Sequence, residues 1–392
     1  MGFLSSLLLL PLTFIHLNSA VNTPKKNLII DTDLYSDVDD AGALLLAATS
    51  PDVNLLAVNI NTKTTFSVLA ASAILSHYGH SHVPIGIPRP LTNITFFDGW
   101  YFSLGEYASK TAYHFSGGKL KWEDRDRLEE LDDLWDPVAL YRKVLSEAED
   151  GSVTIASIGF LDNLSGLLNS TGDKYSSLSG PRLLSAKVRE LVIMGGGYPT
   201  GHSWNFFGSS SSLTAHVINN WDSLVPSVPL FYVGDDVGKY VLTGTPLMTS
   251  GPDNDPVKWA YIWYSYYQPR ASWDPLAVLY AVHGLGDTFE LGNEYGYNHV
   301  DPANGTNTWV WEEGRRNQFF LRLKKRNETV AAKVDELFLQ GSLSAGRQGA
   351  GRGGERLTGQ ARKKDGGGLL WWAYLSLCTV LGTVIVWFSR WT

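Results

Sequence analysis

Residues 27 to 47 read NLIIDTDLYSDVDDAGALLLA, in which an apolar run ends in aspartates and leads at once into a helix-forming segment. A short apolar, β-branched run of this kind is typical of a buried strand. Five aspartates, namely Asp31, Asp33, Asp37, Asp39 and Asp40, fall within the ten residues from 31 to 40. The segment predicts a strand, an acidic turn and a helix, with the carboxylates gathered where the strand ends.

The order of strand, turn and helix recurs from residue 27 to residue 340. It predicts an α/β fold with an open, mostly parallel Rossmann-like sheet and helices on both faces. In such sheets the ligand crevice lies beyond the carboxyl ends of the strands, so the Gly, Asp and Asn residues that end these runs are expected to face one another. The candidate strands are NLIIDTD, NLLAVNI, VPIGI, VTIASIG, ELVIMGG and VPLFYVG.

Residues 294 to 324 have a different pattern, with alternating aromatic residues in EYGYNHV and TNTWVWEE around a turn that contains Pro and Gly. Alternation of this kind is typical of half-buried strands. The pattern predicts a C-terminal β-hairpin appended to the sheet.

The two ends of the chain differ from the domain predicted for residues 21–340. Residues 1–20 are apolar and end in small residues, which predicts a signal peptide cleaved near Ala20. Residues 341–368 are rich in Gly, Arg and Ser and predict a disordered linker. Residues 369–388 carry no charge and have the length of a membrane span, which predicts a transmembrane helix or the tail of a glycolipid-anchor signal. The expected location is the secretory pathway, with the domain membrane-anchored and lumenal or extracellular.

Composition narrows the class of ligand. The chain has 392 residues, of which 44% are hydrophobic, and a net charge of −7. It therefore has no basic field for a nucleic acid polymer, and a small neutral substrate fits better. The single cysteine, Cys378, excludes an intrachain disulfide. The oligomeric state is not fixed by the sequence, and a homo-oligomer stays open. Glycosylation sequons, in keeping with secretion, start at Asn93, Asn163, Asn169, Asn304 and Asn327.

The density of aspartates after the first strand requires compensation. Two carboxylates ~4 Å apart repel by about 4 kcal/mol at an effective dielectric constant of 20. The amino terminus of the following helix offsets only about 0.3–1 kcal/mol for each charge. A divalent cation would hold the group together, and oxygen ligands without His or Cys favour Ca²⁺ or Mg²⁺ over zinc. The alternative is a solvated acidic turn in which an aspartate caps the helix.

Four motifs occur in one order along the chain. The first, residues 31–40, has the form D-T-D-x-x-x-D-x-D-D. It is followed by VTIASIGFLDNLSGLL at 153–168, VRELVIMGGGYPTG at 188–201 and SWDPLAVLYA at 272–281. In these motifs the sequence resembles the inosine–uridine nucleoside hydrolase family, over residues 27–330. The resemblance implies calcium-dependent hydrolysis of the N-glycosidic bond of ribonucleosides, which gives free base and ribose.

The resemblance also implies roles for individual residues. Ca²⁺ would be bound by Asp33, Asp40, Asp274 and the backbone carbonyl of Ile158, and Asp33 would act as the general base toward a metal-bound water. Asp31 and Asp37 would orient the metal ligands.

Other residues are expected to contact the substrate. Asp39 and Asn205 would bind the ribose hydroxyls, and Met194 would line the 5′ side of the sugar. Asn61, which follows the run NLLAVNI, and Trp273 are further substrate-binding candidates.

The chain departs from the family at two positions. Ser203 stands where the family has a Glu that holds the ribose 5′-hydroxyl, and His202 is a candidate to replace that contact. Trp273 stands where many members have a His that is a candidate acid for the leaving base. An aromatic segment is a candidate source of the base pocket or simply of core: Trp259, Tyr261, Trp263, Tyr264, Tyr266 and Tyr267.

Two other functions stay open at this level. Haloacid-dehalogenase-like phosphatases also place two aspartates after a first strand, but their later motifs do not match MGGG and SWDPLA. Ser203 and Trp273 also fit a membrane-tethered protein that binds nucleoside or metal and has lost turnover.

Overall fold

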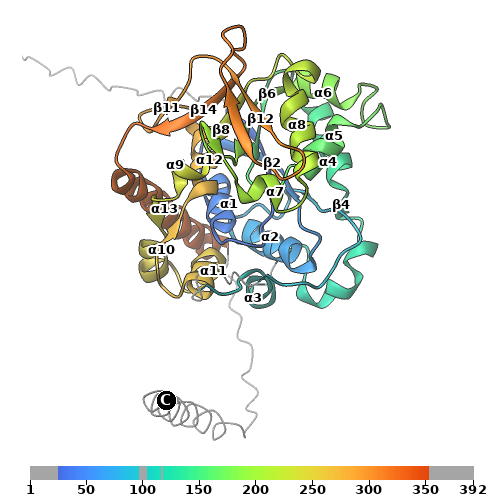
Figure 1. The fold of residues 1–392 in the computed structure, drawn as a ribbon. Coiled ribbons are helices and arrows are strands. Elements are labelled where there is room, and N and C mark those ends of the chain that lie inside the picture. Colours follow the sequence, from blue (N-terminus) through green and yellow to red (C-terminus); the bar gives the residue numbers. More distant parts are fainter. Residues whose placement is uncertain (1–24, 97–103, 116–117, 353–392) are drawn as a thin grey trace, which may run out of the picture. The chain divides into compact units, whose positions relative to one another are not determined.

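The computed structural model describes residues 25–96, 104–115 and 118–352 (Figure 1). Contacts divide the chain into two units, Met1–Gly349 and Ala350–Thr392, and the fold below is that of the first. The predicted signal peptide, residues 1–20, lies outside the described residues.

A nine-stranded sheet forms the centre of this unit, and its order is β11-β14-β8-β6-β5-β1-β2-β3-β4. Every neighbouring pair is parallel except β11 and β14. The strand order reverses at β1, which has β5 on one side and β2 on the other, so a ligand crevice is expected beyond its carboxyl end. The strands span β1 Lys26–Thr32, β2 Val53–Ile60, β3 Ile85–Gly86, β4 Leu134–Trp135, β5 Val153–Ser157, β6 Val188–Met194, β8 Leu230–Val233, β11 Phe289–Leu291 and β14 Gln318–Leu323.

Helices cover both faces of the sheet, as predicted (Figure 1). The side chains of β1 alternate between the two cores: Leu28 and Ile30 pack with α1, α2, α11 and α12, whereas Ile29 packs with α4, α5, α6 and α8. Full burial of each such side chain contributes about 1.5–3 kcal/mol, which explains why the run NLII has no polar face. The helices span α1 Asp39–Thr49, α2 Thr65–His77, α3 Ala108–His114, a 3-10 helix Trp122–Glu130, α4 Pro137–Glu147, α5 Asp162–Leu168, α6 Gly180–Lys187, α7 Trp204–Phe207, α8 Ser211–Leu224, α9 Asp235–Gly238, α10 Thr245–Ser250, α11 Pro256–Ser265, α12 Trp273–His283 and α13 Asn327–Arg352.

The predicted hairpin is present but does not join the main sheet. Strands β12 (Tyr297–Val300) and β13 (Asn307–Val310) are antiparallel, and β13 pairs on its other edge with β7 (Thr200–Gly201) to form a separate three-stranded sheet. The Asn307 side chain explains this attachment, because it donates to the carbonyl of Gly197 at 2.9 Å and accepts from its amide at 3.0 Å. A third small sheet pairs β9 (Leu242–Thr243) with β10 (Arg270–Ala271).

Helix α13 continues past the predicted end of the domain at residue 340. It ends at Arg352, within the stretch 341–368 for which a linker is predicted. Ser342 on this helix is buried and donates a hydrogen bond to Asp255, which helps to fix the helix on the domain.

The fold-class prediction also ended on a transmembrane helix, and this part is corrected. Among residues 25–96, 104–115 and 118–352, no helix combines the length and the apolar character that a membrane span requires. Helix α13 has 26 residues but carries charges such as Glu328, Lys333 and Asp335. Residues 369–388 themselves lie outside the described residues.

Candidate active site

Three aspartates meet where two helices begin beside the carboxyl end of β1. Helix α1 starts with Asp39 and Asp40, and helix α12, which packs against α1, carries Asp274 as its second residue. One oxygen from each of the three carboxylates lies within 4.8 Å of the others. All three side chains are buried, at 1–4% exposure. The fold thus gathers acids from the first and the last of the family-like motifs.

The carboxylates of this group are partly satisfied by local donors. Asp39 Oδ2 accepts the backbone amides of Trp273 at 2.9 Å and Asp274 at 3.0 Å, so a residue of α1 caps the amino terminus of α12. Asp40 Oδ1 accepts the amide of Leu34 at 3.1 Å and the hydroxyl of Thr32. Leu34, whose amide makes this contact, has a φ of 35°, a strained value for a non-glycine residue.

Local donors do not offset the charge of this group. Burial raises the pKa of Asp39, Asp40 and Asp274 well above the usual range, and repulsion among the neighbouring aspartates raises it further. Buried carboxylates that repel one another fit a divalent cation, and an all-oxygen donor set fits a hard ion. Within the described part of the chain, Asp39, Asp40 and Asp274 are the set placed to hold a metal ion.

Asp33 lies beside this set and is not one of its three members. Its Oδ2 accepts the hydroxyl of Ser36 at 3.1 Å. Burial raises the pKa of Asp33 to about 6, against the lowering effect of hydrogen bonds from Ser36 and Asp40. The family resemblance implied Asp33 as a metal ligand and Asp39 as a sugar ligand, whereas the geometry gathers Asp39 with Asp40 and Asp274.

Asp31 sits in a cradle of donors under the turn. It accepts hydrogen bonds from Tyr141 at 2.6 Å, from Asn163 at 3.2 Å and from Asn61. Burial nevertheless raises the pKa of Asp31 to about 7. Asn61, a substrate-binding candidate, thus uses its side-chain nitrogen to support Asp31. Asn163, which starts a glycosylation sequon, is buried with its side-chain nitrogen engaged.

Gly159 allows the chain after β5 to approach this turn. A Cβ atom at position 159 would lie 2.1 Å from Asn61 Oδ1 and 2.3 Å from the amide nitrogen of Asp33. Backbone atoms cannot move away as a side chain can, so only glycine fits. The glycine that ends VTIASIG is thus explained by close packing of β5 against the aspartate turn.

Asp37 forms an ion pair that the sequence did not reveal. Arg270 Nε lies 3.0 Å from each oxygen of Asp37, and the guanidinium carbon lies 5.3 Å from the ring centre of Trp273. Tyr107 donates to the backbone carbonyl of Asp37 at 2.7 Å. The only sequence signal was a basic residue four positions before Asp274, and nothing connected it with residue 37.

The residues expected around the sugar come together at the ends of β5 and β6. Asn205, in the short helix α7, donates to the carbonyl of Ile158 at 2.9 Å and to the carbonyl of Met194 at 3.3 Å. Its side-chain nitrogen also lies 3.1 Å from the sulfur of Met194. The carbonyl predicted to bind metal and two predicted sugar contacts thus form one connected group.

The other substrate-site candidates, His202 and the aromatic segment 259–267, differ in their contacts and exposure. His202 contacts the carbonyl of Asn304 at 2.9 Å and stacks on Phe207. In the aromatic segment, Tyr261 and Tyr264 are buried in the core, whereas Tyr266 and Tyr267 are 57% and 55% exposed.

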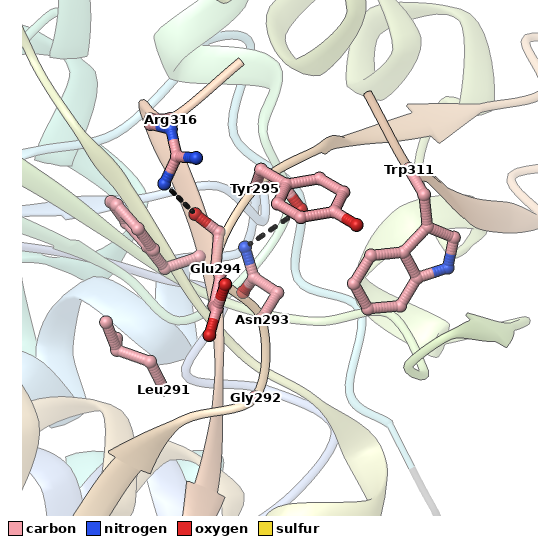
Figure 2. A pocket seen from close by; sticks show the side chains of 8 residues that line it. Leu291, Gly292, Asn293, Glu294, Tyr295, Trp311 and Arg316 are labelled. Carbon is pink, nitrogen blue, oxygen red and sulfur yellow. Dashed lines mark hydrogen bonds between the residues drawn. The ribbon is translucent and has the colours of Figure 1, made fainter. Parts of the chain in front are cut away.

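An open depression of about 580 Å³ lies elsewhere, beside the amino end of β14 (Figure 2). Figure 2 shows the rings of Tyr295 and Trp311 on one side of it, with Arg316 donating to the carbonyl of Glu294. Because β14 is parallel to β8, this is the end of the sheet opposite the aspartates. The depression therefore does not belong to the aspartate site.

The fold and the site define a class of protein. It is an α/β protein with a group of buried acids, suited to hold a metal ion, at the carboxyl ends of a parallel sheet. Residues 28–338 match the family model described as inosine-uridine preferring nucleoside hydrolase, and the chain belongs to that family. It is a hydrolase that acts on the N-glycosyl bonds of nucleosides.

Relatives and solved structures agree with this assignment. An inosine-uridine preferring nucleoside hydrolase of Crithidia fasciculata is 26% identical over 279 residues, which cover 66% of this chain and 79% of that protein. A purine-preferring ribonucleoside hydrolase of Gardnerella vaginalis is similar in fold, with a TM-score of 0.59, 16% identity and coverage of 82% and 100%. A plant nucleoside hydrolase gives a TM-score of 0.57, 19% identity and coverage of 81% and 99%.

Proposed function

We propose that the chain hydrolyses ribonucleosides to free base and ribose in a calcium-dependent reaction, with Asp33 activating the attacking water. The observation that carries the proposal is the placement of Asp33 beside Asp40, a member of the buried acidic set. Gly159 packs against the amide of Asp33, and its neighbour Ile158 accepts a hydrogen bond from Asn205. The groups proposed to activate water and the groups proposed to hold a sugar then lie at the same end of the sheet.

Asp40 and Asp274 are the residues proposed to hold the cation, since they belong both to the family's ligand set and to the group of three carboxylates. Asp33 and the Ile158 carbonyl are proposed as further ligands. Calcium is favoured over magnesium because Ca²⁺ takes about 6–8 oxygen ligands in flexible geometry. A bound dication supplies positive charge that balances the carboxylates and lowers the pKa of water at the site.

The protein's own groups account for the proton that water loses. Asp33, with its pKa raised to about 6 by burial, is ionised at neutral pH and can accept a proton from water. The water oxygen bonds to C1′ of the ribose, and the C1′–N bond breaks with its electron pair passing to the base. Carboxylates around the sugar favour the positive charge that develops on the ring.

Asp39 and Asn205 are proposed to bind the ribose hydroxyls. Asp39 is oriented by the two amides at the start of α12, and Asn205 by its contacts with Ile158 and Met194. Both side chains are therefore positioned before substrate binds, which reduces the conformational entropy lost on binding.

The leaving base needs a proton from solvent. Trp273 does not supply it, because its indole N–H donates to the carbonyl of Asp235 at 2.8 Å and indole is not an acid at neutral pH. The exposed rings of Tyr266 and Tyr267, in the segment that leads to Arg270, are proposed to stack on the base. Such stacking contributes about 1–3 kcal/mol for each base.

The test is base release by the full-length chain from a panel of purine and pyrimidine ribonucleosides, with calcium and after chelation. We expect release that is lost on chelation and restored by calcium. Calcium binding without base release from any nucleoside would contradict the proposal, and would favour a binding protein that has lost turnover at Ser203 and Trp273.

We also propose that the chain enters the secretory pathway, on the evidence of the apolar residues 1–20. Amino-terminal sequencing of the protein purified from its own cells tests this. A mature chain that begins near Val21 is expected, and a chain that retains residues 1–20 would contradict it.

A further inference from the structure

Asp235 lies at the sugar side of the site, just beyond the end of β8, the strand next to the one that carries Met194. It is the first residue of α9 and follows β8, whose last residue, Val233, pairs with Met194 at the end of β6. The amide of Asp235 donates to the carbonyl of Gly196 at 2.8 Å. The residue is therefore fixed at the same edge of the sheet as the group formed by Asn205 and Met194.

Two contacts orient Asp235. The hydroxyl of Ser203 donates to Asp235 Oδ1 at 2.8 Å, and the indole N–H of Trp273 donates to the Asp235 carbonyl at 2.8 Å. The backbone amide of Trp273 donates to Asp39. Trp273 thus connects Asp235 with Asp39, one of the three grouped aspartates. Ser203 connects Asp235 with α7, the helix that contains Asn205. The two positions at which this chain departs from its family both contact Asp235.

The second carboxylate oxygen, Asp235 Oδ2, accepts no hydrogen bond from the described residues. Burial raises the pKa of Asp235 to about 6, so the group is still ionised at neutral pH. An ionised carboxylate can only accept hydrogen bonds, and a half-buried one favours a ligand that brings a donor. A neutral hydroxyl meets this requirement, whereas a phosphate group would be repelled.

We propose that Asp235, oriented by Ser203, binds the primary 5′-hydroxyl of the ribose and makes the site selective for nucleosides over their 5′-phosphates. The inference rests on the proposed function, because it assumes that ribose occupies the crevice beside Asn205. Ser203 is too short to reach the hydroxyl as a Glu at that position would, and it holds instead a carboxylate supplied by another strand end.

The test compares inosine with 5′-deoxyinosine as substrates of the full-length chain. Losing a hydrogen bond to a charged group lowers kcat/KM by about 10–100-fold, so Asp235→Ala should show that loss on inosine. On 5′-deoxyinosine the same variant should match the wild type, because the hydroxyl is already absent. Asp236→Ala, which removes the exposed carboxylate next in the chain, is the matched control and should leave both substrates unchanged.

Asp235→Glu and Ser203→Ala extend the test if Asp235→Ala does not fold. The first keeps the carboxylate and should retain part of the preference for inosine. The second keeps the carboxylate but removes its anchor, and should lower kcat/KM on inosine less than Asp235→Ala does. Equal turnover of the two substrates by the wild type would overturn the inference and leave the proposed function intact.

A binding measurement keeps the inference testable without turnover. Calorimetric titration of calcium-loaded Asp33→Asn protein with inosine and with 5′-deoxyinosine should show tighter binding of inosine, and adding Asp235→Ala should abolish the difference. If the wild type released no base but this difference were present, the inference would stand while the proposed hydrolysis failed. Equal binding of the two ligands by the Asp33→Asn protein would overturn it.

Discussion

The two ends of the central sheet have opposite physical character. At the carboxyl end, Asp39, Asp40 and Asp274 are buried together with few compensating donors. At the amino end of β14, the depression in Figure 2 is wide and open, and its charged residues Glu294 and Arg316 are exposed. An open depression costs the fold little, whereas buried like charge costs several kcal/mol unless a ligand balances it.

The comparison shows that an open depression and a group of buried acids make different demands on the fold. Exposed charges are screened by water, so the outer depression is stable without a ligand. The aspartates are held close by the strands and helices that carry them. A bound cation would balance their charge. Substitutions at either end of the sheet, and the addition of calcium, test this contrast.

Asp33→Asn should lower kcat for nucleoside hydrolysis by about 10²–10⁴-fold, because an amide cannot take the proton from water. The fold should be retained, since the side chain keeps its size and its contact with Ser36. Base release measures the rate, and thermal denaturation measures the fold. Asp52→Asn, an exposed acid away from the site, is the control. Retention of more than about a tenth of the wild-type kcat would show that Asp33 is not the base.

Calcium should stabilise the chelated full-length chain by about 2.7 kcal/mol when its concentration reaches about 100 times the dissociation constant. The reason is that the ion balances carboxylates that otherwise repel one another. The midpoint of thermal unfolding measures the effect. Asp274→Ala should greatly reduce the shift, whereas Asp52→Ala should leave it intact. No shift, together with no metal in the purified protein, would count against a metal site.

Tyr141→Phe should lower the free energy of unfolding by about 1–3 kcal/mol, because it removes a donor from the buried carboxylate of Asp31. Urea denaturation measures the loss. Tyr113→Phe, at a ring that is 57% exposed, is the matched control and should change stability by less than about 0.5 kcal/mol. Equal effects of the two substitutions would mean that the donors around Asp31 do not support the site.

Trp311→Ala should change the activation free energy from kcat/KM, and the stabilisation by calcium, by less than about 0.5 kcal/mol each. The reason is that this 55% exposed ring lies at the other end of the sheet. The same nucleoside assay and thermal titration measure it. A tenfold fall in kcat/KM would show that the outer depression contributes to catalysis, and would remove the contrast between the two ends.

Much of the fold could be read from local pattern. The runs from NLIIDTD to VPLFYVG each contain an observed strand of the main sheet, because burial on both faces demands continuous apolar residues. The density of aspartates in residues 31–40 predicts a bound cation, and the family resemblance adds Asp274, which the structure places with Asp39 and Asp40. The sheet to which the hairpin belongs was not predicted, since its pairing depends on Asn307 reaching Gly197.

The sequence by itself determined the family, the parallel sheet and the acids that end its strands, because these depend on neighbouring residues and on short motifs. Only the tertiary structure decided which acidic side chains lie together and which partners they contact. Asp37 pairs with Arg270 across 233 positions of sequence, Asp39 joins Asp40 and Asp274, and Ser203 holds Asp235. Such contacts are set by how helices and strand ends pack in space, and no pattern of neighbouring residues encodes that distance.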